Sequence, residues 1–439
     1  MVIVGLVLAF WLFVLAVCVH AADPLIAMPN FWKRDPATGV ISHNGPVSIG
    51  NTLPTGTGTS IDPVYGLRSP NISVPGNRVV FLGDSIEIRG GNDINWVQDA
   101  WVSHFLIRGG GRVHMLHNAG IGGNRTDQMV TRFATDVAAY RPDKVFIKGG
   151  TNDIDVLTTA QTLANLQQLV MLVKSIGATP IICTIPPKSG KATAVNAINL
   201  GVKRIARSNR ITLVDFHSVL ANEATGNLTA AYDSGDGVHP SKTGARAMAD
   251  AAISATAHLW QPLNFLPTDN TDTNNMLANG LFLTDAGADG VADSWTKGGT
   301  SSTVVSSLVT DAAIKGKWQQ FVRTDSGSVT MAQSFNAASN KWAVGDRLAF
   351  TGRVQTANVD SGSSAYKVWI SYAGPNTLIY PISSLWQLDT EGAFYIETVV
   401  PEGTTGVTVY AAFQDGTAGT FKMAQWGLYN LTKMGIDAL

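Results

Sequence analysis

Residues 77 to 262 alternate short apolar runs with helical patterns, and this alternation constrains the fold more than any other feature of the chain. Each apolar run ends in a loop, and a segment with helical periodicity usually follows. An alternation of this kind predicts a parallel sheet covered by helices on both faces. The predicted strands are 79–82, 113–117, 144–148, 180–184 and 211–214, and the predicted helices lie around 126–139, 160–176, 194–208 and 242–258.

After about residue 263 the pattern changes to alternating polar and apolar residues separated by Gly, Asn and Thr turns. No strong helical pattern interrupts it, so residues 263–439 are predicted to form an all-β, jelly-roll-like sandwich. A chain of 439 residues can hold two domains, each with its own core. We therefore expect the α/β domain at 77–262 and the sandwich to fold as separate units. Residues 22–76, rich in Gly, Pro, Ser and Thr, are predicted to be an extended lead-in.

The N-terminal segment predicts export. Residues 2–19 carry no charge, and the small residues that precede Ala22 suit a signal peptidase, so 1–21 is predicted to be a signal peptide and the protein secreted or extracytoplasmic. No Lys or Arg precedes the apolar run, so an uncleaved membrane anchor is the alternative. Cleavage would remove Cys18 and leave Cys183 alone, which excludes an intramolecular disulfide framework.

The charge balance excludes an electrostatically driven partner. The chain has 31 basic and 32 acidic residues and a formal net charge of -1, so nothing attracts it as a whole to nucleic acid or to an anionic membrane. We expect no nucleic-acid partner, and a membrane contact only if the N-terminal segment stays uncleaved. The expected partner is an ester substrate that is recognised locally.

The predicted strand 79–82 runs directly into Gly83-Asp84-Ser85, at the end of the strand where α/β proteins place their reactive groups. These are also common turn residues, so Ser85 alone would indicate only a turn. A second loop, Asp236-Gly237-Val238-His239, precedes the last predicted helix. A serine needs an imidazole to accept its proton and a third group to orient that imidazole. Ser85, His239 and Asp236 therefore form a predicted catalytic triad.

Two further loops could stabilise the oxyanion of a tetrahedral intermediate. Residues 118–124 follow the second strand, and their glycines allow backbone N–H groups to approach a ligand. Residues 149–153 follow the third strand and contain Asn152, whose side-chain amide is another donor. Taken singly, each loop is more often an ordinary turn between strand and helix.

These blocks, in this order, resemble those of the SGNH (GDSL-like) hydrolase superfamily over about residues 77–262. The resemblance implies a flavodoxin-like three-layer α/β/α fold, ester hydrolysis and no cofactor or metal. It places the nucleophile on Ser85, the remainder of the triad on Asp236 and His239, and the oxyanion hole on Ser85, Gly123 and Asn152. Whether Gly122 or Gly123 donates stays open. Ile86-Glu87 departs from the family's usual residues after the serine, so the pocket beside the nucleophile is expected to be unusual.

Residues 274–280 and 289–295 resemble the opening of carbohydrate-binding jelly rolls. A sugar-stacking platform could involve some of the tryptophans, although most tryptophans in a sandwich are core: Trp295, Trp318, Trp342, Trp369, Trp386 and Trp426. Asp285, Asp289 and Asp293 offer oxygen ligands that suit calcium, but a full calcium loop is absent and a solvated turn is favoured.

Three functions remain open on the sequence alone. The first is an exported esterase that deacetylates a glycan, held on it by the sandwich. The second is a lipid or short-chain carboxylester hydrolase with a structural β-domain. The third is a non-catalytic adhesion or virion-type binding protein, against which the complete set of catalytic residues argues.

Overall fold

The computed structural model describes two compact units, Met1–Gly76 and Asn77–Leu439. In the first unit only the backbone of five short strands is described: β1 (Lys33–Arg34) pairs with β2 (Ile41–Ser42), and β3 (Ser60–Asp62), β4 (Gly66–Ser69) and β5 (Ile72–Ser73) form a second small sheet. The predicted signal peptide or anchor at 1–21 lies outside the described residues. The second unit is described over 77–261, 266–358, 366–382, 389–413 and 418–436. Within these ranges no helix has the length and apolarity needed to cross a membrane.

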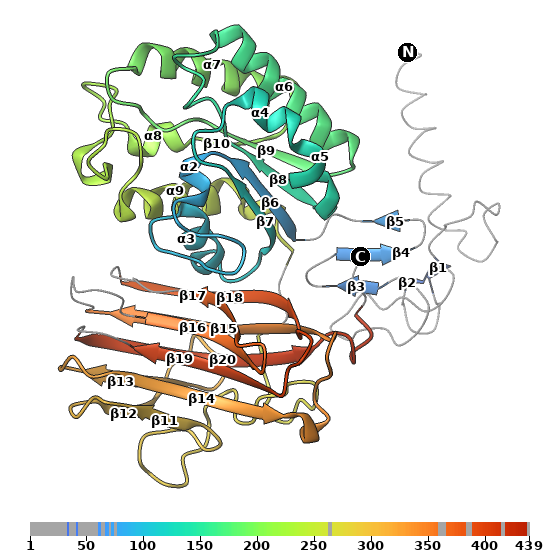
Figure 1. Cartoon of the computed structure of the whole chain (residues 1–439), viewed down its shortest axis with the longest axis vertical. Helices are drawn as coiled ribbons and strands as arrows, with labels where there is room; N and C mark the ends of the chain where they lie inside the picture. Colours follow the sequence, from blue (N-terminus) through green and yellow to red (C-terminus); the bar gives the residue numbers. More distant parts are fainter. Residues whose placement is uncertain are drawn as a thin grey trace, which may run out of the picture. The chain divides into compact units, whose positions relative to one another are not determined.

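The first half of the larger unit is a five-stranded parallel sheet with the order β10-β9-β8-β6-β7 (Figure 1). In chain order this is the 2-1-3-4-5 arrangement of flavodoxin-like folds, so the predicted fold class is confirmed. Its strands are β6 (Arg78–Gly83), β7 (His114–Gly120), β8 (Lys144–Ile147), β9 (Thr179–Cys183) and β10 (Thr212–Val214). In such a sheet the reactive crevice lies beyond the carboxyl ends of β6 and β8, where the chain leaves in opposite directions.

Both faces of this sheet are buried. Along β6, Val79 and Phe81 point into one core, whereas Val80 and Leu82 point into another. The first face is covered by α3 (Trp101–Arg108) and α9 (Lys242–Thr256), and the second by α4 (Thr126–Thr131), α5 (Phe133–Asp136), α6 (Thr159–Ser175) and α7 (Ala192–Asn209). The short helices α2 (Ser85–Ile88) and α8 (Phe216–Leu220) and the 3-10 turns η1 (Ala138–Tyr140), η2 (Ala230–Tyr232) and η3 (Ala257–Leu259) complete the domain.

Two local predictions need correction. The helix expected over 126–139 is divided into α4, α5 and η1, because Arg132 leaves helical geometry at φ -91° and ψ 3°. The segment before β7 contains α3, which was not predicted, although nearly all of its residues are buried. At eight residues α3 spans little more than two turns, so its apolar residues are too few to distinguish a helix from a strand or a loop by periodicity.

The second half is a sandwich of two five-stranded antiparallel sheets, as predicted. One sheet has the order β11-β14-β19-β16-β17 and the other β12-β13-β20-β15-β18, so the chain crosses repeatedly between them. Its strands are β11 (Thr296–Gly299), β12 (Val305–Thr310), β13 (Lys317–Arg323), β14 (Val329–Asn336), β15 (Arg347–Ala357), β16 (Tyr366–Ala373), β17 (Thr377–Ile382), β18 (Thr390–Val399), β19 (Gly406–Phe413) and β20 (Gly419–Asn430), with the 3-10 turn η4 (Ala337–Ser339).

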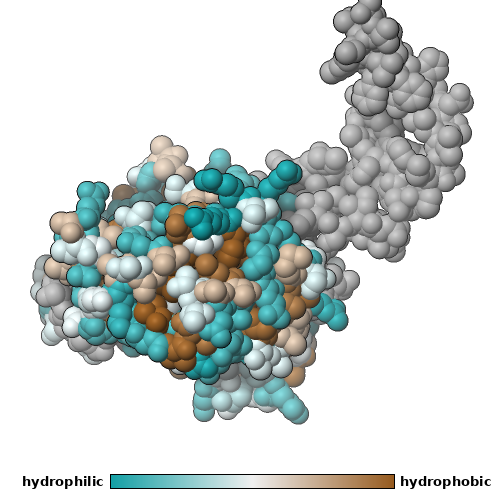
Figure 2. All heavy atoms as spheres, turned by 90° about the horizontal axis from the view of Figure 1, so that it is seen from above, coloured by the Kyte–Doolittle hydropathy of each residue, from teal (hydrophilic) through white to brown (hydrophobic). Residues whose placement is uncertain are grey.

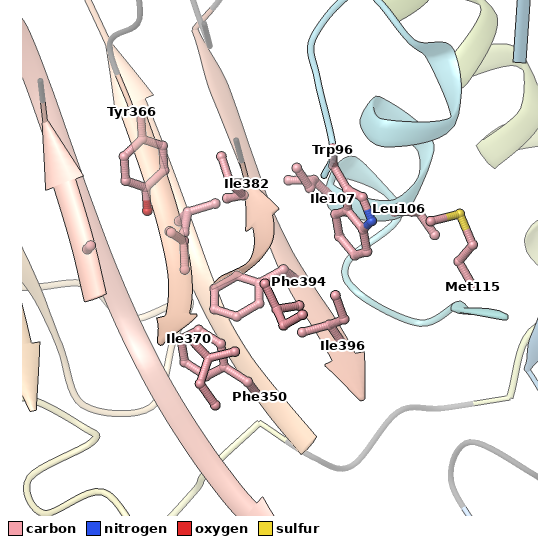
Figure 3. Close-up of a cluster of buried hydrophobic side chains, with 14 of the residues drawn as sticks. Trp96, Leu106, Ile107, Met115, Phe350, Tyr366, Ile370, Ile382, Phe394 and Ile396 are labelled. Atoms are coloured by element: carbon pink, nitrogen blue, oxygen red, sulfur yellow. The ribbon is translucent and has the colours of Figure 1, made fainter. Parts of the chain in front are cut away.

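The α/β domain and the sandwich share one hydrophobic core, which differs from the expectation of separate units. Figure 3 shows Trp96, Leu106 and Ile107 beside Phe394 and Ile396 of β18. The predicted boundary at 262/263 lies outside the described residues. The sequence pattern of each domain predicts the layers of that domain. It does not predict that α3 packs against β18, which lies more than 280 residues later in the chain.

Polar contacts reinforce this shared core. The amide of Tyr380 donates to the carbonyl of Ile94 at 2.8 Å, and the amide of Trp96 donates to the carbonyl of Tyr380 at 3.3 Å. Burial, opposed by the charge of nearby Glu397, lowers the pKa of the His114 imidazole, whose Nδ1 lies 3.3 Å from the Glu397 carboxylate. The two domains are therefore joined by backbone pairing as well as by apolar packing.

Apolar side chains on the surface of the α/β domain are dispersed. Ile121, Val156, Met171 and Leu200 are exposed and come from different loops and helices. Figure 2 shows small apolar groups interspersed with hydrophilic residues on the face seen from above. Single exposed apolar residues of this kind are normal on soluble proteins.

Candidate active site

Ser85 is the first residue of α2, immediately beyond the carboxyl end of β6. The turn that presents it is pinned on both sides: Asp84 caps the helix by accepting the amide of Ile86 at 2.9 Å, and the Glu87 carboxylate accepts the amide of Asp84 at 2.8 Å. Gly83 is required here, because a Cβ at this position would lie 1.8 Å from the Glu87 carboxylate. The half-buried serine is therefore held at the edge of the sheet on a turn whose other residues are buried.

The structure brings the three residues of the predicted triad together. Ser85 Oγ lies 2.7 Å from His239 Nε2, and His239 Nδ1 lies 2.6 Å from Asp236 Oδ2. These distances join hydroxyl, imidazole and carboxylate in one hydrogen-bonded chain. The bond from Nδ1–H to Asp236 fixes the tautomer in which Nε2 is free to accept the serine proton.

Backbone amides of the loop 236–239 donate hydrogen bonds to the Asp236 carboxylate. Its Oδ1 accepts the amides of Val238 at 2.9 Å and His239 at 2.8 Å. Partial burial opposes ionisation, but these amides and the imidazole outweigh it and lower the pKa of Asp236. The group is therefore ionised at neutral pH and can stabilise a positively charged His239.

The two glycine-rich loops meet beside the serine turn. The amide of Ile121 donates to the carbonyl of Gly83, at 3.3 Å. Gly123 adopts φ +74°, a left-handed conformation that favours glycine, whereas no such requirement is seen at Gly122. The Asn152 amide donates to the carbonyl of Asn124 at 3.1 Å. An amide group carries two N–H donors, so this bond orients Asn152 and leaves a second donor for a ligand.

A buried charge cluster, Asp84, Glu87 and Lys148, lies beneath the nucleophile and was not predicted from the sequence. Lys148 Nζ lies 2.6 Å from the Asp84 carboxylate and 3.2 Å from that of Glu87, and all three side chains are at most 1% exposed. Trp101 Nε1–H donates to the second oxygen of Glu87 at 3.1 Å. Glu87, which the sequence analysis identified as unusual, is thus paired with Lys148, the residue that follows β8.

Burial raises the pKa of Glu87 to about 7, with Lys148 opposing and Asp84 adding to the shift. Desolvation disfavours the ammonium of Lys148, yet the two carboxylates outweigh it and raise its pKa. The only sequence signal for this cluster was the unusual Glu87 itself, since a single lysine at the end of a strand normally indicates a solvated side chain.

A second anchor holds the Asn152 loop from behind. The buried Asp153 carboxylate accepts the Thr126 amide, at 3.2 and 3.3 Å to its two oxygens, and the hydroxyls of Thr126 and Thr162. Lys188 Nζ donates to the carbonyl of Thr151 at 3.2 Å, next to Asn152. These bonds fix the loop to α4 and α6, and Asp153 is engaged in structure rather than facing a ligand.

The structure separates the tryptophans of the sandwich into core and surface. Trp295, Trp318, Trp342 and Trp426 are buried, Trp386 lies outside the described residues, and Trp369 is half-buried on the outer side of β16. The Trp369 ring stacks on Tyr410 of β19 at 4.7 Å between centroids and lies 5.8 Å from Tyr380 of β17. This aromatic row, Tyr380-Trp369-Tyr410, crosses three adjacent strands.

The carboxylates of the acidic turn in the sandwich accept hydrogen bonds from the backbone of the same turn. Asp285 accepts the amide of Gly290 at 2.9 Å, Asp289 that of Val291 at 2.9 Å, and Asp293 that of Ala286 at 3.0 Å. Within the described ranges, no group of three or more His, Cys, Asp or Glu side chains is placed to hold a metal ion.

Comparison with known proteins finds a matching family profile and a curated relative. The sequence profile described as the GDSL-like lipase/acylhydrolase family matches residues 81–247. The uncharacterized lipoprotein YqeF of Bacillus subtilis (strain 168) is 36% identical over 120 residues, which are 25% of this chain and 48% of that protein. The chain thus spans about half the length of this curated relative.

Solved structures similar to this chain include a GDSL-like lipase and an acetylxylan esterase. A GDSL-like lipase from Bacteroides thetaiotaomicron VPI-5482 is 24% identical, with 42% of this chain and 89% of that chain covered and a TM-score of 0.36. The acetylxylan esterase Axe2 from Geobacillus stearothermophilus is 24% identical, with 41% of this chain and 94% of that chain covered and a TM-score of 0.36.

Proposed function

Residues 81–247 belong to the GDSL-like lipase/acylhydrolase family, and from this membership and the site geometry we propose that the protein is a serine esterase that hydrolyses carboxylic esters. The observation that carries the proposal is the hydrogen-bonded chain from Ser85 Oγ through His239 to Asp236. A helix-capping or structural serine has no need of an oriented imidazole at 2.7 Å.

In the proposed reaction, Ser85 Oγ attacks the ester carbonyl carbon while its proton passes to His239 Nε2. Asp236 holds the imidazole and stabilises its positive charge. Collapse of the tetrahedral intermediate breaks the bond to the alcohol, which leaves with the proton from His239. A water molecule, deprotonated by His239, then attacks the acyl-enzyme, releases the carboxylic acid and restores Ser85. No cofactor is required at any step.

The negative charge of both tetrahedral intermediates falls on the former carbonyl oxygen. We assign its stabilisation to the backbone N–H groups of Ser85 and Gly123 and to the side-chain amide of Asn152. The positive φ of Gly123 and the bond that orients Asn152 support this assignment, because both fix donors before a substrate binds. Donors that are already oriented cost no reorganisation when the charge develops.

The preferred substrate is an acetylated glycan. Support comes from the aromatic row Tyr380-Trp369-Tyr410, since half-exposed aromatic rings on a sheet offer apolar surface for the C–H faces of sugar rings. The row begins at Tyr380, whose backbone pairs with Ile94 of the α/β domain. A polymer held along it would therefore stay beside the hydrolase domain, and tethering would raise its local concentration. This substrate implies a secreted or extracytoplasmic protein.

Three substrates separate this function from its alternatives: nitrophenyl acetate, nitrophenyl decanoate and an acetylated polysaccharide. A glycan deacetylase releases acetate from the polymer and prefers the acetyl ester to the decanoyl ester. A lipid hydrolase prefers the decanoate. A binding protein that has lost turnover hydrolyses none of them.

Substitution of the aromatic row tests the glycan assignment separately. Trp369→Ala should slow acetate release from the polymer while leaving nitrophenyl acetate hydrolysis unchanged. The matched control is Trp318→Phe, a conservative change of a buried core tryptophan in the opposite sheet. Equal rates for Trp369→Ala and wild type on the polymer would remove the row from substrate binding.

A further inference from the structure

We infer that Arg132 is a positioning residue for the proposed oxyanion hole, because its guanidinium joins the serine turn to the loop of Gly123, and Asn124 of that loop accepts the side-chain amide of Asn152. The inference rests on the proposed esterase function and adds a residue that the sequence did not indicate. Arg132 lies at the break between α4 and α5, far in sequence from the serine and from Asn152.

All three nitrogen atoms of the Arg132 guanidinium donate hydrogen bonds. Nη2 donates to the carbonyl of Gly83 at 2.8 Å, Nε donates to Oδ1 of Asn124 at 2.8 Å, and Nη1 pairs with the Asp136 carboxylate at 2.7 Å. The side chain is 12% exposed, so these bonds are little weakened by solvent. Such a fork holds its partners in fixed relative positions, which a single ammonium group cannot do.

Two of the three partners, Gly83 and Asn124, belong to different parts of the proposed site. Gly83 is the last residue of β6, immediately before the capping residue of the serine turn. Asn124 follows Gly123, and its carbonyl accepts the side-chain amide of Asn152 at 3.1 Å. Through Arg132, the Gly83 carbonyl and the Asn124 side chain are held together, and Asn124 in turn sets the direction of the Asn152 amide.

The helix break explains how the side chain reaches these partners. Arg132 closes α4 with its own amide bonded to the carbonyl of Gln128 at 3.1 Å, and then opens α5. Asp136 lies one turn further along and pairs with the guanidinium from the opposite side. The sequence predicts a continuous helix here. The interruption lets the Arg132 guanidinium reach Asn124, the residue after Gly123.

The test compares Arg132→Met, Arg132→Lys and a matched control, Arg125→Met. The Arg125 guanidinium also pairs with a carboxylate, with bonds of 3.1 and 3.0 Å to Asp127, but neither bond goes to Gly83 or to the Asn124 side chain. Rates on nitrophenyl acetate are expressed per reactive serine, counted by titration with a fluorophosphonate. The melting temperature is measured for each variant.

Arg132→Met should lower kcat about 10- to 100-fold per reactive serine with KM within about twofold of wild type, since loosened donors act on the transition state. Arg132→Lys should recover only part of this loss, and Arg125→Met should match wild type. In an Asn152→Ala background, Arg132→Met should have a much smaller effect, because the donor it orients is already gone.

Two results would overturn the inference. One is a wild-type kcat per reactive serine in Arg132→Met, even if its melting temperature falls, which would make Arg132 a purely structural residue. The other is a double variant, Arg132→Met with Asn152→Ala, whose loss in kcat equals the product of the losses in the two single variants. A wild-type protein that neither hydrolyses esters nor reacts with the fluorophosphonate refutes the esterase function itself, which separates the two failures.

Discussion

Truncation of Ile107 to alanine tests whether the α/β domain and the sandwich are one cooperative unit. Ile107 lies on α3, is fully buried, and lines a small space with Val354, Tyr366 and Ile382 of the sandwich. The backbones already touch here, because a Cβ at Gly392 would lie 2.2 Å from the carbonyl oxygen of Ile107. The surroundings therefore have little room to collapse into the cavity that the substitution leaves.

Removing three carbons from such a site typically costs about 2–5 kcal/mol, and the limited relaxation places Ile107→Ala at roughly 3 kcal/mol or more. The assay is urea unfolding followed by tryptophan fluorescence. Both domains contain buried tryptophans, so both contribute to the signal. A shared core predicts one transition for the whole unit, shifted to lower urea in the variant.

Leu200→Ala is the control, since Leu200 is 52% exposed on α7 and should change the free energy of unfolding by less than about 0.5 kcal/mol. Two separate transitions in the wild-type protein, or a cost below about 1 kcal/mol for Ile107→Ala, would refute the shared core. For the same reason a chain ending near residue 262 should be less stable than the full chain, because it would expose the α3 face that β18 covers.

Three further outcomes follow from the site. Asn152→Ala should lower kcat on nitrophenyl acetate by about 10²–10³ with KM little changed, and an unchanged kcat would reduce Asn152 to a turn residue. Asp236→Asn should retain more activity than His239→Ala in the same assay, because the carboxylate acts through the imidazole; the reverse order would contradict its orienting role.

The third outcome concerns pH. Burial raises the pKa of Glu87 in the folded state to about 7, above its usual value of 4.5. The folded state therefore binds the proton more tightly than the unfolded state, so this stabilisation is fully present below pH 4.5 and is lost as the pH rises through 7. Wild type should therefore lose stability relative to Glu87→Gln between pH 4.5 and 8 in urea unfolding, and parallel stability profiles would contradict the assignment.

The sheet and the arrangement of the predicted triad could be predicted from the sequence because their signals are local. A run such as 79–82 followed by Gly83-Asp84-Ser85 specifies a strand, its end and a reactive turn within a few residues. The order of strands then brings the loop of Asn152 beside it, since carboxyl ends of parallel strands share one edge. In the structure the Asn152 side chain bonds Asn124 of the neighbouring loop, and the catalytic roles of Ser85, His239 and Asp236 stay a prediction.

Features that depend on distant partners could not be predicted in this way. Lys148 resembles a solvated lysine until Asp84 and Glu87 are seen around it, and buried ion clusters have no periodicity of their own. Likewise, the helical pattern around Arg132 gives no sign that its side chain bonds Gly83 across the domain. The docking of α3 on the sandwich depends on shape complementarity between surfaces far apart in the chain, which residue patterning does not encode.

The most direct test of the esterase account is covalent labelling of the nucleophile. Wild-type protein is incubated with diethyl nitrophenyl phosphate and analysed by intact-mass and peptide mass spectrometry. We predict one diethylphosphoryl adduct, on the peptide that contains Ser85, with no adduct in Ser85→Ala and greatly slowed labelling in His239→Ala. An adduct on another residue, or labelling of Ser85 at the wild-type rate without His239, would contradict the proposed triad.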